Sequence, residues 1–401
     1  MSSKSGFSID RLRRLTARMQ ARVAAGDIAG VVTLVHRRGV EAHCDVIGWQ
    51  DEESRTAMRR DTIFRIASMT KPVACVAALM LLEEGVLSLN DPIERWLPEL
   101  ANRRVLRDPL GDLSDTAPSP GPITVEHLMT HRPGFASQFI DGGPVGREAA
   151  KLHVGNGLLL QGDSVDDWLR RLGELPLVHA PGARMNYGFT TDVLGLLVGR
   201  ASGLGFERFL QTRLFDPLGM NDTGFHVPPA KRDRLAAAYV TDPATSRRVI
   251  ADPVEGTRWG EPPAVPSASA GLVSTADDYM KFARLLLANG RAGGQRLLSR
   301  KTIELMTSDF LTPEQRRMPF MGTDMWTHHG FGLGVSIVER LGGRPQLGSV
   351  GTYGWGGAFG TWWANDPTEA MSVVLMVQLL VGTGVQLAPE FTNLVYQAID
   401  D

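Results

Sequence analysis

The chain opens with an apolar stripe at helical spacing. Apolar side chains about one turn apart follow Ser8, namely Ile9, Leu12, Leu15, Met19 and Val23. This spacing predicts an α-helix with one buried face, and Ser8 is suited to cap its N-terminus. Two β-branched runs then flank Arg37-Arg38-Gly39, a pattern typical of a β-hairpin.

The middle of the chain keeps helical spacing, whereas the C-terminal part returns to strands. From Leu89 to about Pro266, apolar residues recur as in VEHLMTH and TDVLGLLVGRASG, between proline-rich loops such as APSPGP. A later helix, TADDYMKFARLLLANG, has Thr275 as its predicted N-cap and ends at Gly290. Strand patterns follow in GFGLGVSIVERLGG, GGAFGTWWANDP and MSVVLMVQLL, and PEFTNLVYQAID is predicted to be a closing helix.

These patterns predict the α+β/α fold class: an antiparallel sheet flanked by helices, built from both chain ends, with an inserted, mostly helical domain. We expect residues 1–67 and 267–401 to form a discontinuous sheet domain and residues 68–266 the helical one. An active site is expected at the seam between the two, where clefts for small molecules are common.

Composition narrows the class of protein. The chain has 401 residues and a net charge of −2, which gives no electrostatic case for binding nucleic acid or an anionic membrane. Its two cysteines, Cys44 and Cys75, are too few for a disulfide framework. The N-terminal segment MSSKSGFSIDRLRRL lacks the apolar stretch of a secretory signal, and no apolar run is long enough to cross a membrane. We therefore expect a cytoplasmic protein.

One short motif points to nucleophilic chemistry. Ser68-Met69-Thr70-Lys71 is followed at once by Pro72, which is tolerated only near the start of a helix. Ser68 then lies near a helix N-terminus, and Lys71, three residues on, shares its face and can reach its hydroxyl. A serine hydroxyl needs such a base to become a nucleophile. The alternative is a capping serine beside a solvated lysine.

Two further elements support the chemical interpretation. Tyr187 lies in a loop before an apolar helix, and Trp355-Gly356-Gly357 lies on a predicted edge strand, where glycines let a ligand approach the backbone. The structural alternatives are a half-buried tyrosine and a tight bend. There is no G-x-S-x-G sequence, which excludes the nucleophile elbow of α/β-hydrolases.

In this order, the three elements resemble those of the serine β-lactamase-fold esterases, the family VIII carboxylesterases, which are related to class C β-lactamases and penicillin-binding proteins. The stretches ITVEHLMTHRPGF, LFDPLGMNDTGF and SAGLVSTADDYMKFARLLLANG are also similar to segments that recur in that family. The resemblance runs roughly from Ile9 to Ile399 and implies a β-lactamase/transpeptidase-like fold.

The resemblance implies a role for each matching residue. Ser68 matches the nucleophile, Lys71 its partner and Tyr187 the general base for acylation, which also returns the proton to the leaving group. The oxyanion hole would be formed by the backbone N–H groups of Ser68 and Ala358. No cofactor is implied.

Substrate choice is where the sequence departs from its relatives. Trp355-Gly356-Gly357 replaces the K-T-G element of β-lactamases, and Phe189 stands where an asparagine follows the tyrosine. Without that lysine and asparagine, an anionic amide substrate loses charge-assisted hydrogen bonds of about 1.5–3 kcal/mol each. We therefore predict that these four positions bind neutral esters with short acyl chains, with Trp355 as an apolar wall. Arg344, placed by the fold, is an alternative partner for a substrate carboxylate.

The predicted function is a serine carboxylesterase that acts on a small-molecule ester through a Ser68 acyl-enzyme. The alternatives are an acyltransferase, an amidase or β-lactamase of the same fold, and a non-catalytic penicillin-binding-type protein. His127 and His131 have a spacing that can hold a metal on a helix, but no third ligand is evident, so we expect no metal. Patterns in the chain leave the oligomeric state open.

Overall fold

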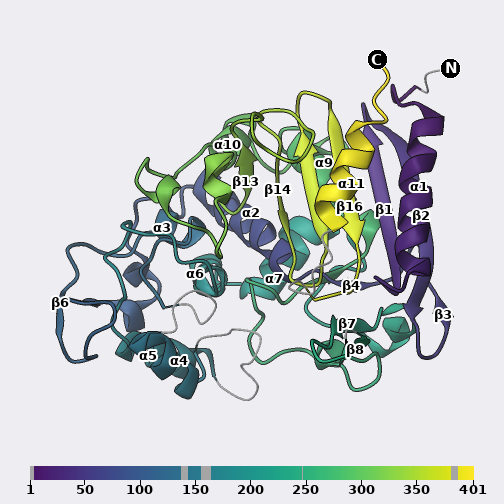
Figure 1. Cartoon of the computed structure of the whole chain (residues 1–401). Helices are drawn as coiled ribbons and strands as arrows, with labels where there is room; N and C mark the ends of the chain where they lie inside the picture. The colour runs from purple at the N-terminus through teal and green to yellow at the C-terminus, as the bar shows by residue number, and fades with distance from the viewer. Residues whose placement is uncertain (1–3, 137–142, 155–163, 246, 381–386) are drawn as a thin grey trace.

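The computed structural model describes residues 4–136, 143–154, 164–245, 247–380 and 387–401. Its centre is an eight-stranded antiparallel sheet with the strand order β12-β13-β14-β15-β16-β1-β2-β3 (Figure 1). The strands of this sheet are β1 (Gly30–Arg37), β2 (Val40–Asp51), β3 (Thr56–Ala57), β12 (His329–Phe331), β13 (Ser336–Val338), β14 (Tyr353–Gly356), β15 (Trp362–Asp366) and β16 (Met371–Met376).

The sheet is assembled from both ends of the chain. Strand β1 pairs with its hairpin partner β2 on one side and with β16 on the other, where Leu34 lies opposite Val374. The hairpin turn is formed by Arg38 and Gly39, with φ angles of 54° and 79°. Two left-handed residues are what a tight turn between twisted strands requires. The predicted fold class and hairpin are confirmed.

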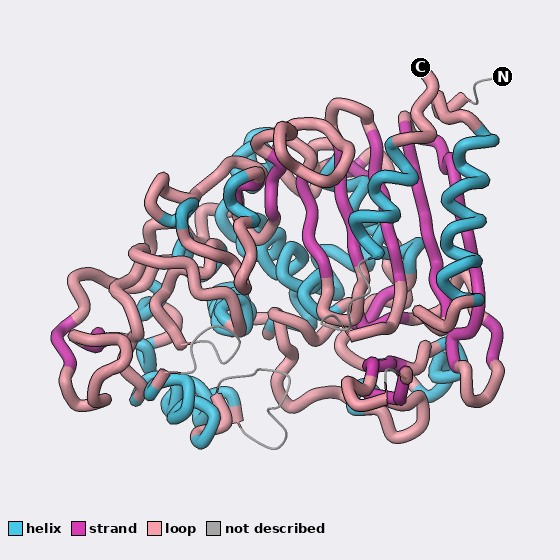
Figure 2. The backbone as a smooth tube through the Cα atoms, viewed as in Figure 1, coloured by secondary structure: helices cyan, strands magenta, loops and turns pink. Residues whose placement is uncertain are grey.

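Helices cover both faces of this sheet, as Figure 2 shows. Helices α1 (Ile9–Ala24) and α11 (Leu387–Tyr396) pack on one face, and α9 (Ala276–Leu287) packs on the other. Side chains of β1 alternate accordingly: Val31 and Val35 contact the α1 and α11 side, whereas Val32 and Leu34 contact the opposite core. This period of two is the signature of a strand buried on both faces.

Local signals explain where two of these helices begin. The Ser8 hydroxyl accepts a hydrogen bond from the Arg11 N–H, and the Thr275 hydroxyl accepts one from the Asp278 N–H. Both caps satisfy backbone donors that the first helical turn leaves free. The two predicted N-caps are therefore confirmed.

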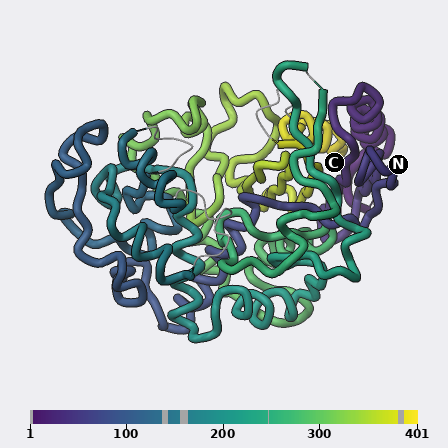
Figure 3. Tube along the Cα trace, turned by 90° about the horizontal axis from the view of Figure 1, so that it is seen from below, coloured from purple at the N-terminus to yellow at the C-terminus, as the bar shows by residue number. Residues whose placement is uncertain are grey.

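The inserted region is mostly helical. Seen from below, its blue residues lie at the left, away from both chain ends, and its teal residues run back towards them (Figure 3). Its helices are α2 (Thr70–Glu83), α3 (Val125–Met129), α4 (Pro144–Lys151), α5 (Val165–Glu174), α6 (Thr190–Ser202), α7 (Phe206–Leu210) and α8 (Asp216–Leu218). Helix α2 is buried on all sides over most of its length and packs against α6. The exact domain boundaries at 67/68 and 266/267 stay a prediction.

Short two-stranded ladders and one further helix complete the described α-helices and strands. The ladders pair β4 (Phe64–Arg65) with β9 (Val273–Ser274), β5 (Arg104–Leu106) with β6 (Thr116–Pro118), β7 (Ala238–Thr241) with β8 (Arg248–Asp252), and β10 (Arg291–Ala292) with β11 (Gln295–Arg296); the helix is α10 (Arg300–Met306). Within the described residues, no helix combines the length and apolar character that crossing a membrane requires.

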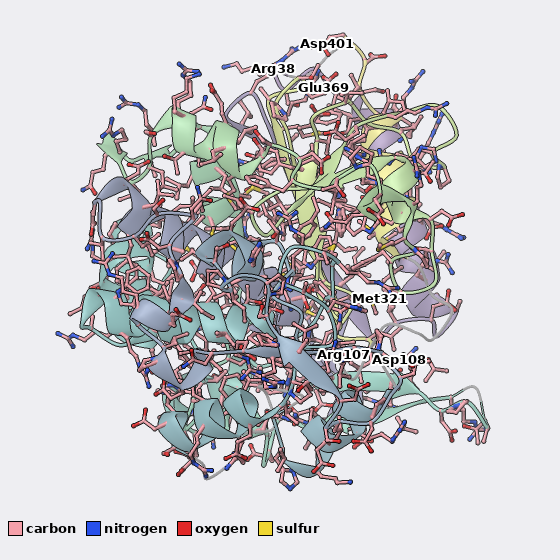
Figure 4. All side chains as sticks on the ribbon, turned by 90° about the vertical axis from the view of Figure 1, so that its left-hand side faces the viewer. Arg38, Arg107, Asp108, Met321, Glu369 and Asp401 are labelled. Atoms are coloured by element: carbon pink, nitrogen blue, oxygen red, sulfur yellow. The ribbon has the colours of Figure 1, made fainter. Side chains whose placement is uncertain are left out.

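Ion pairs join the two ends of the chain beside the sheet. The Asp401 carboxylate forms ion pairs with Arg37 and Arg38, and Arg37 forms a second ion pair with Glu369. Figure 4 shows Arg38, Glu369 and Asp401 gathered at the top of the molecule. Arg37 is almost fully buried, so its two carboxylate partners neutralise a charge that would otherwise be costly in the interior.

Candidate active site

Ser68 lies in a short 3-10 turn, Ala67–Met69, that leads directly into α2. The residue before it, Ala67, has a φ of 44°, a left-handed conformation that costs free energy for a residue with a side chain. Neighbouring segments hold the turn: the Ile66 N–H donates to the Leu272 carbonyl at 3.1 Å, and the Tyr279 hydroxyl donates to the Met69 carbonyl at 2.8 Å. The turn keeps Ser68 partly exposed at the start of an otherwise buried helix.

Lys71 reaches back to Ser68, as the spacing predicts. Its ammonium nitrogen Nζ donates to Ser68 Oγ at 3.1 Å and to the Ser269 carbonyl at 2.8 Å. The residue is only 3% exposed, so this is not the solvated lysine of the alternative interpretation. Lys71 is held in the interior by one contact within its own turn and one from the distant residue Ser269.

Tyr187 completes the group. Its ring lies over Lys71, with Nζ 4.6 Å from the ring centroid, a distance at which a cation is attracted to the aromatic face. Its hydroxyl oxygen accepts a hydrogen bond of 2.8 Å from the indole Nε1 of Trp355. The sequence predicts an apolar wall at Trp355, and the structure adds a polar contact that sequence reasoning missed.

The strand that carries Trp355 differs from the prediction. β14 is not an edge strand of the sheet, because β13 and β15 flank it. Its pairing with β13 covers only Tyr353 and Gly354, however, whereas its pairing with β15 runs on to Gly356. Among the described residues, the end of β14 therefore has an open edge at Trp355 and Gly356, although the strand as a whole is internal.

Gly357 brings the end of β14 against the turn that carries Ser68. A Cβ atom at this position would lie 2.3 Å from the Ile66 carbonyl oxygen, so only glycine allows this approach. Ala358 follows in a turn and is exposed. The oxyanion pair of Ser68 and Ala358 stays a prediction, and the close contact with Ile66 explains how strand and turn come together.

Two residues considered for substrate binding lie elsewhere. Phe189 stacks on Phe135, with ring centroids 5.8 Å apart. Both rings lie in the large hydrophobic core to which the helical region contributes side chains. Arg344 lines a small hollow with Tyr396 of α11, and burial lowers the pKa of its guanidinium. Arg344 therefore does not stand in for the missing lysine beside Ser68. The role of Phe189 in substrate binding stays a prediction.

An apolar cluster surrounds the Tyr187 side of the site. Its buried members are Tyr187, Leu311, Trp326, Phe331 and Trp355. Phe320 packs edge-on against Tyr187, with ring centroids 5.4 Å apart. A charge near these rings is poorly solvated, which strengthens its interaction with any nearby polar group.

The two histidines considered for a metal site have different roles. His127 caps α3, its Nδ1 accepting from the Thr124 N–H at 3.2 Å. His131 is fully buried, and its ring centroid lies 4.7 Å from that of Tyr187. Burial and the nearby charge of Lys71 hold the pKa of His131 well below its usual value, so its imidazole is neutral at physiological pH. No sequence signal distinguished His131 as a neighbour of the catalytic candidates.

The arrangement of these groups matches acyl-transfer chemistry. The Lys71 ammonium contacts both a partly exposed serine hydroxyl and a tyrosine ring, and a donor from the sheet fixes the phenol oxygen. These are the parts of a nucleophile with its proton carriers. The described residues contain no group of three or more potential metal ligands.

Comparison with known proteins gives the family. The β-lactamase family profile matches residues 15–396. Protein Rv1367c of Mycobacterium tuberculosis is 41% identical over 357 residues, with 88% of this chain and 86% of that protein covered. Esterase EstB of Burkholderia gladioli is 31% identical over 394 residues, with 93% of this chain and 92% of EstB covered.

A solved structure agrees over nearly the whole length. EstCE1, described as a hydrolase with promiscuous acyltransferase activity, superposes with a TM-score of 0.82 at 26% identity, covering 98% of this chain and 99% of its own. The predicted resemblance to β-lactamase-fold esterases is confirmed. The chain belongs to the β-lactamase family and has the fold of its ester-hydrolysing members.

Proposed function

We propose that this protein is a serine carboxylesterase that cleaves small neutral esters through an acyl-enzyme on Ser68. The observation that carries the proposal is the contact chain in which Lys71 donates to Ser68 while its ammonium lies against Tyr187. A capping serine would need neither partner. The name of the relative EstB supports ester hydrolysis in this fold.

The proposed acylation step uses these contacts. Ser68 Oγ attacks the ester carbonyl and passes its proton to the oxygen of Tyr187, which enters the step as its phenolate, while the Lys71 ammonium contacts both side chains. The negative charge that forms on the carbonyl oxygen would be met by the N–H groups of Ser68 and Ala358. When the tetrahedral intermediate collapses, the alkoxide leaves and takes the proton from Tyr187 as an alcohol. Water then attacks the acyl-enzyme and loses a proton to the Tyr187 phenolate; when this second intermediate collapses, the acid is released and Ser68 Oγ takes that proton back from Tyr187.

Trp355 supports the choice of a neutral ester. It occupies the position where β-lactamases carry a lysine, and its one polar group is already bonded to Tyr187. An indole N–H is a single donor, so Trp355 offers no charged contact to a substrate carboxylate. The buried apolar cluster on the same side suits an acyl or alcohol group instead.

Acyl transfer is the second candidate. The structural relative EstCE1 has promiscuous acyltransferase activity beside its hydrolase activity, and an alcohol in place of water would accept the same acyl group from Ser68. Incubation with a short-chain aryl ester and an excess of a second alcohol separates the two activities, because transfer yields a new ester and hydrolysis yields only the acid.

A fluorophosphonate probe followed by peptide mass spectrometry tests the nucleophile. We expect the label on Ser68 in the natural protein and none on that peptide in Ser68→Ala. Ser299→Ala is the matched control, because Ser299 also lies at a helix start but serves as a cap for α10. Equal labelling and esterase activity in Ser68→Ala would overturn the proposal.

A further inference from the structure

Asp192 is a buried carboxylate beside the site that sequence reasoning missed. It lies in the first turn of α6, five residues after Tyr187, and is 4% exposed. An acidic residue in a first helical turn is ordinary, so the sequence did not distinguish it. One carboxylate oxygen, Oδ1, accepts from the Ser269 N–H at 2.7 Å and from Ser267 Oγ at 2.8 Å. The other, Oδ2, is buried without a hydrogen-bond partner among the described residues.

Ser269 links Asp192 to Lys71. Ser269 donates its N–H to Asp192 and accepts from Lys71 Nζ, at 2.8 Å, through its carbonyl oxygen. The Thr191 hydroxyl is 3.0 Å from the Ser269 hydroxyl and adds a third contact to the same residue. The position of Lys71 therefore depends on a short loop that is anchored from the start of α6.

Charge gives a second link between the two residues. Burial raises the pKa of Asp192, and the attraction of Lys71 acts in the opposite direction. Among the described residues, the other titratable groups near Lys71 are Tyr187, His131 and Cys75. Burial keeps His131 unprotonated and raises the pKa of the Cys75 thiol, so both are neutral. Asp192 is an acidic group whose charge interacts with this buried ammonium.

We propose that Asp192 is a positioning residue for Lys71: it anchors the loop whose Ser269 carbonyl holds the Lys71 ammonium, and it provides a counter-charge to that ammonium. This inference rests on the proposed esterase function and assigns the proton carriers within it. Lys71 then acts as a fixed cation that orients Ser68, and Tyr187 receives the Ser68 proton. If Lys71 were itself the base, it would have to be neutral, and a buried carboxylate would oppose that state.

A stability cycle tests the link without any need for activity. Thermal unfolding is measured for the natural protein, Lys71→Gln, Asp192→Asn and the double variant. Each single change leaves the other charge buried and uncompensated, whereas the double change removes both. We expect the double variant to unfold at a temperature at least as high as the less stable single variant. Additive losses would overturn the coupling, and so would an Asp192→Asn protein that cannot be folded and is not rescued by Lys71→Gln.

A pH profile tests the consequence for catalysis. Asparagine keeps an acceptor for the Ser269 N–H and removes only the charge of Asp192. We expect kcat of Asp192→Asn to fall about tenfold or more, KM for a small neutral ester to change little, and the alkaline limb of kcat/KM to move to lower pH by about one unit or more. Asp278→Asn is the matched control, because Asp278 is an equally buried carboxylate in the first turn of α9 that holds another loop.

The outcomes separate the two proposals. An unchanged alkaline limb in Asp192→Asn, an equal shift in Asp278→Asn, or a gain of activity at neutral pH overturns the role of Asp192. Absence of esterase activity in the natural protein overturns the proposed function instead, and the stability cycle still decides whether Asp192 and Lys71 are coupled.

Discussion

The indole N–H of Trp355 donates a 2.8 Å hydrogen bond to the hydroxyl oxygen of Tyr187, so a side chain of the sheet fixes the phenol that lies against Lys71. An indole N–H can only donate. The bond therefore stabilises a Tyr187 oxygen that carries negative charge more than one that carries a proton. A lysine at this position would do the same with a full charge. In the proposed mechanism, tryptophan therefore replaces the lysine as a donor to Tyr187 but not as a partner for a substrate carboxylate.

Trp355→Phe keeps the ring and removes this donor. We expect kcat to fall about tenfold or more and the acidic limb of the kcat/KM profile to move to higher pH, because the charged phenol loses a stabilising partner. Trp326→Phe is the control, since Trp326 belongs to the same buried cluster and packs on Phe320 rather than bonding to Tyr187. A Trp355→Phe enzyme with the natural pH profile would show that the bond has no part in proton transfer.

Lys71 and Tyr187 are expected to act as one unit. Lys71→Ala and Tyr187→Phe should each lower kcat on a short-chain aryl ester by about 10²–10³. The double variant should be little worse than the worse single variant, because groups that share one step do not contribute independently. Steady-state kinetics of the four proteins, with circular dichroism to check folding, measures this. Losses that multiply would argue against a shared role.

Substrate choice is a third test. We expect efficient hydrolysis of p-nitrophenyl butyrate, weak hydrolysis of nitrocefin and no notable hydrolysis of benzylpenicillin, with kcat/KM for the β-lactams lower by several orders of magnitude. Trp355 is engaged with Tyr187, and Arg344 lies against α11, so neither offers a charged partner to the β-lactam carboxylate. Each 1.4 kcal/mol of lost binding lowers affinity about tenfold. A penicillin value within tenfold of the ester value would make the protein a β-lactamase.

His127 makes stability depend on pH. Burial, assisted by the charge of Arg132, lowers the pKa of His127 from 6.5 to about 4. Between these values the unfolded chain binds a proton that the folded protein does not, so stability falls as pH drops from about 6.5 towards 4. His127→Gln keeps a side chain that can reach back to the helix cap. We expect the melting temperature of this variant to fall less between pH 7 and pH 5 than that of the natural protein. Equal falls in the two proteins would exclude His127 as a source of the pH dependence.

Local elements of the fold could be predicted because their signals are local. Ser8 and Thr275 cap helices with their own neighbours in sequence, and the hairpin turn at Arg38 and Gly39 needs only adjacent residues. The contact between Ser68 and Lys71 is of the same kind, because three residues along a helix place both on one face. Nothing outside the segment has to be known for these predictions.

The rest of the site depends on residues that are far apart in the chain. Asp192 and Ser269 meet because α6 packs beside a distant loop, and Tyr187 meets Trp355 only when sheet and helical region come together. The edge-strand prediction was wrong for the same reason: a strand's neighbours are set by the whole sheet, and β13 covers part of β14. Such pairings leave no pattern in the local sequence.

The pairing of β1 with β16 also has a cost during biosynthesis. Leu34 and Val374 are partners although 340 positions separate them, from 374 minus 34. At roughly 5–20 residues per second, a ribosome takes on the order of tens of seconds to make the chain between them. During that time β1 has its hairpin partner β2 but its other edge is open, which is the state in which β-strands associate with other chains. The growing chain therefore exposes the middle of its largest sheet until translation is almost finished, and its yield in a cell should depend on whatever shields that edge in the interval.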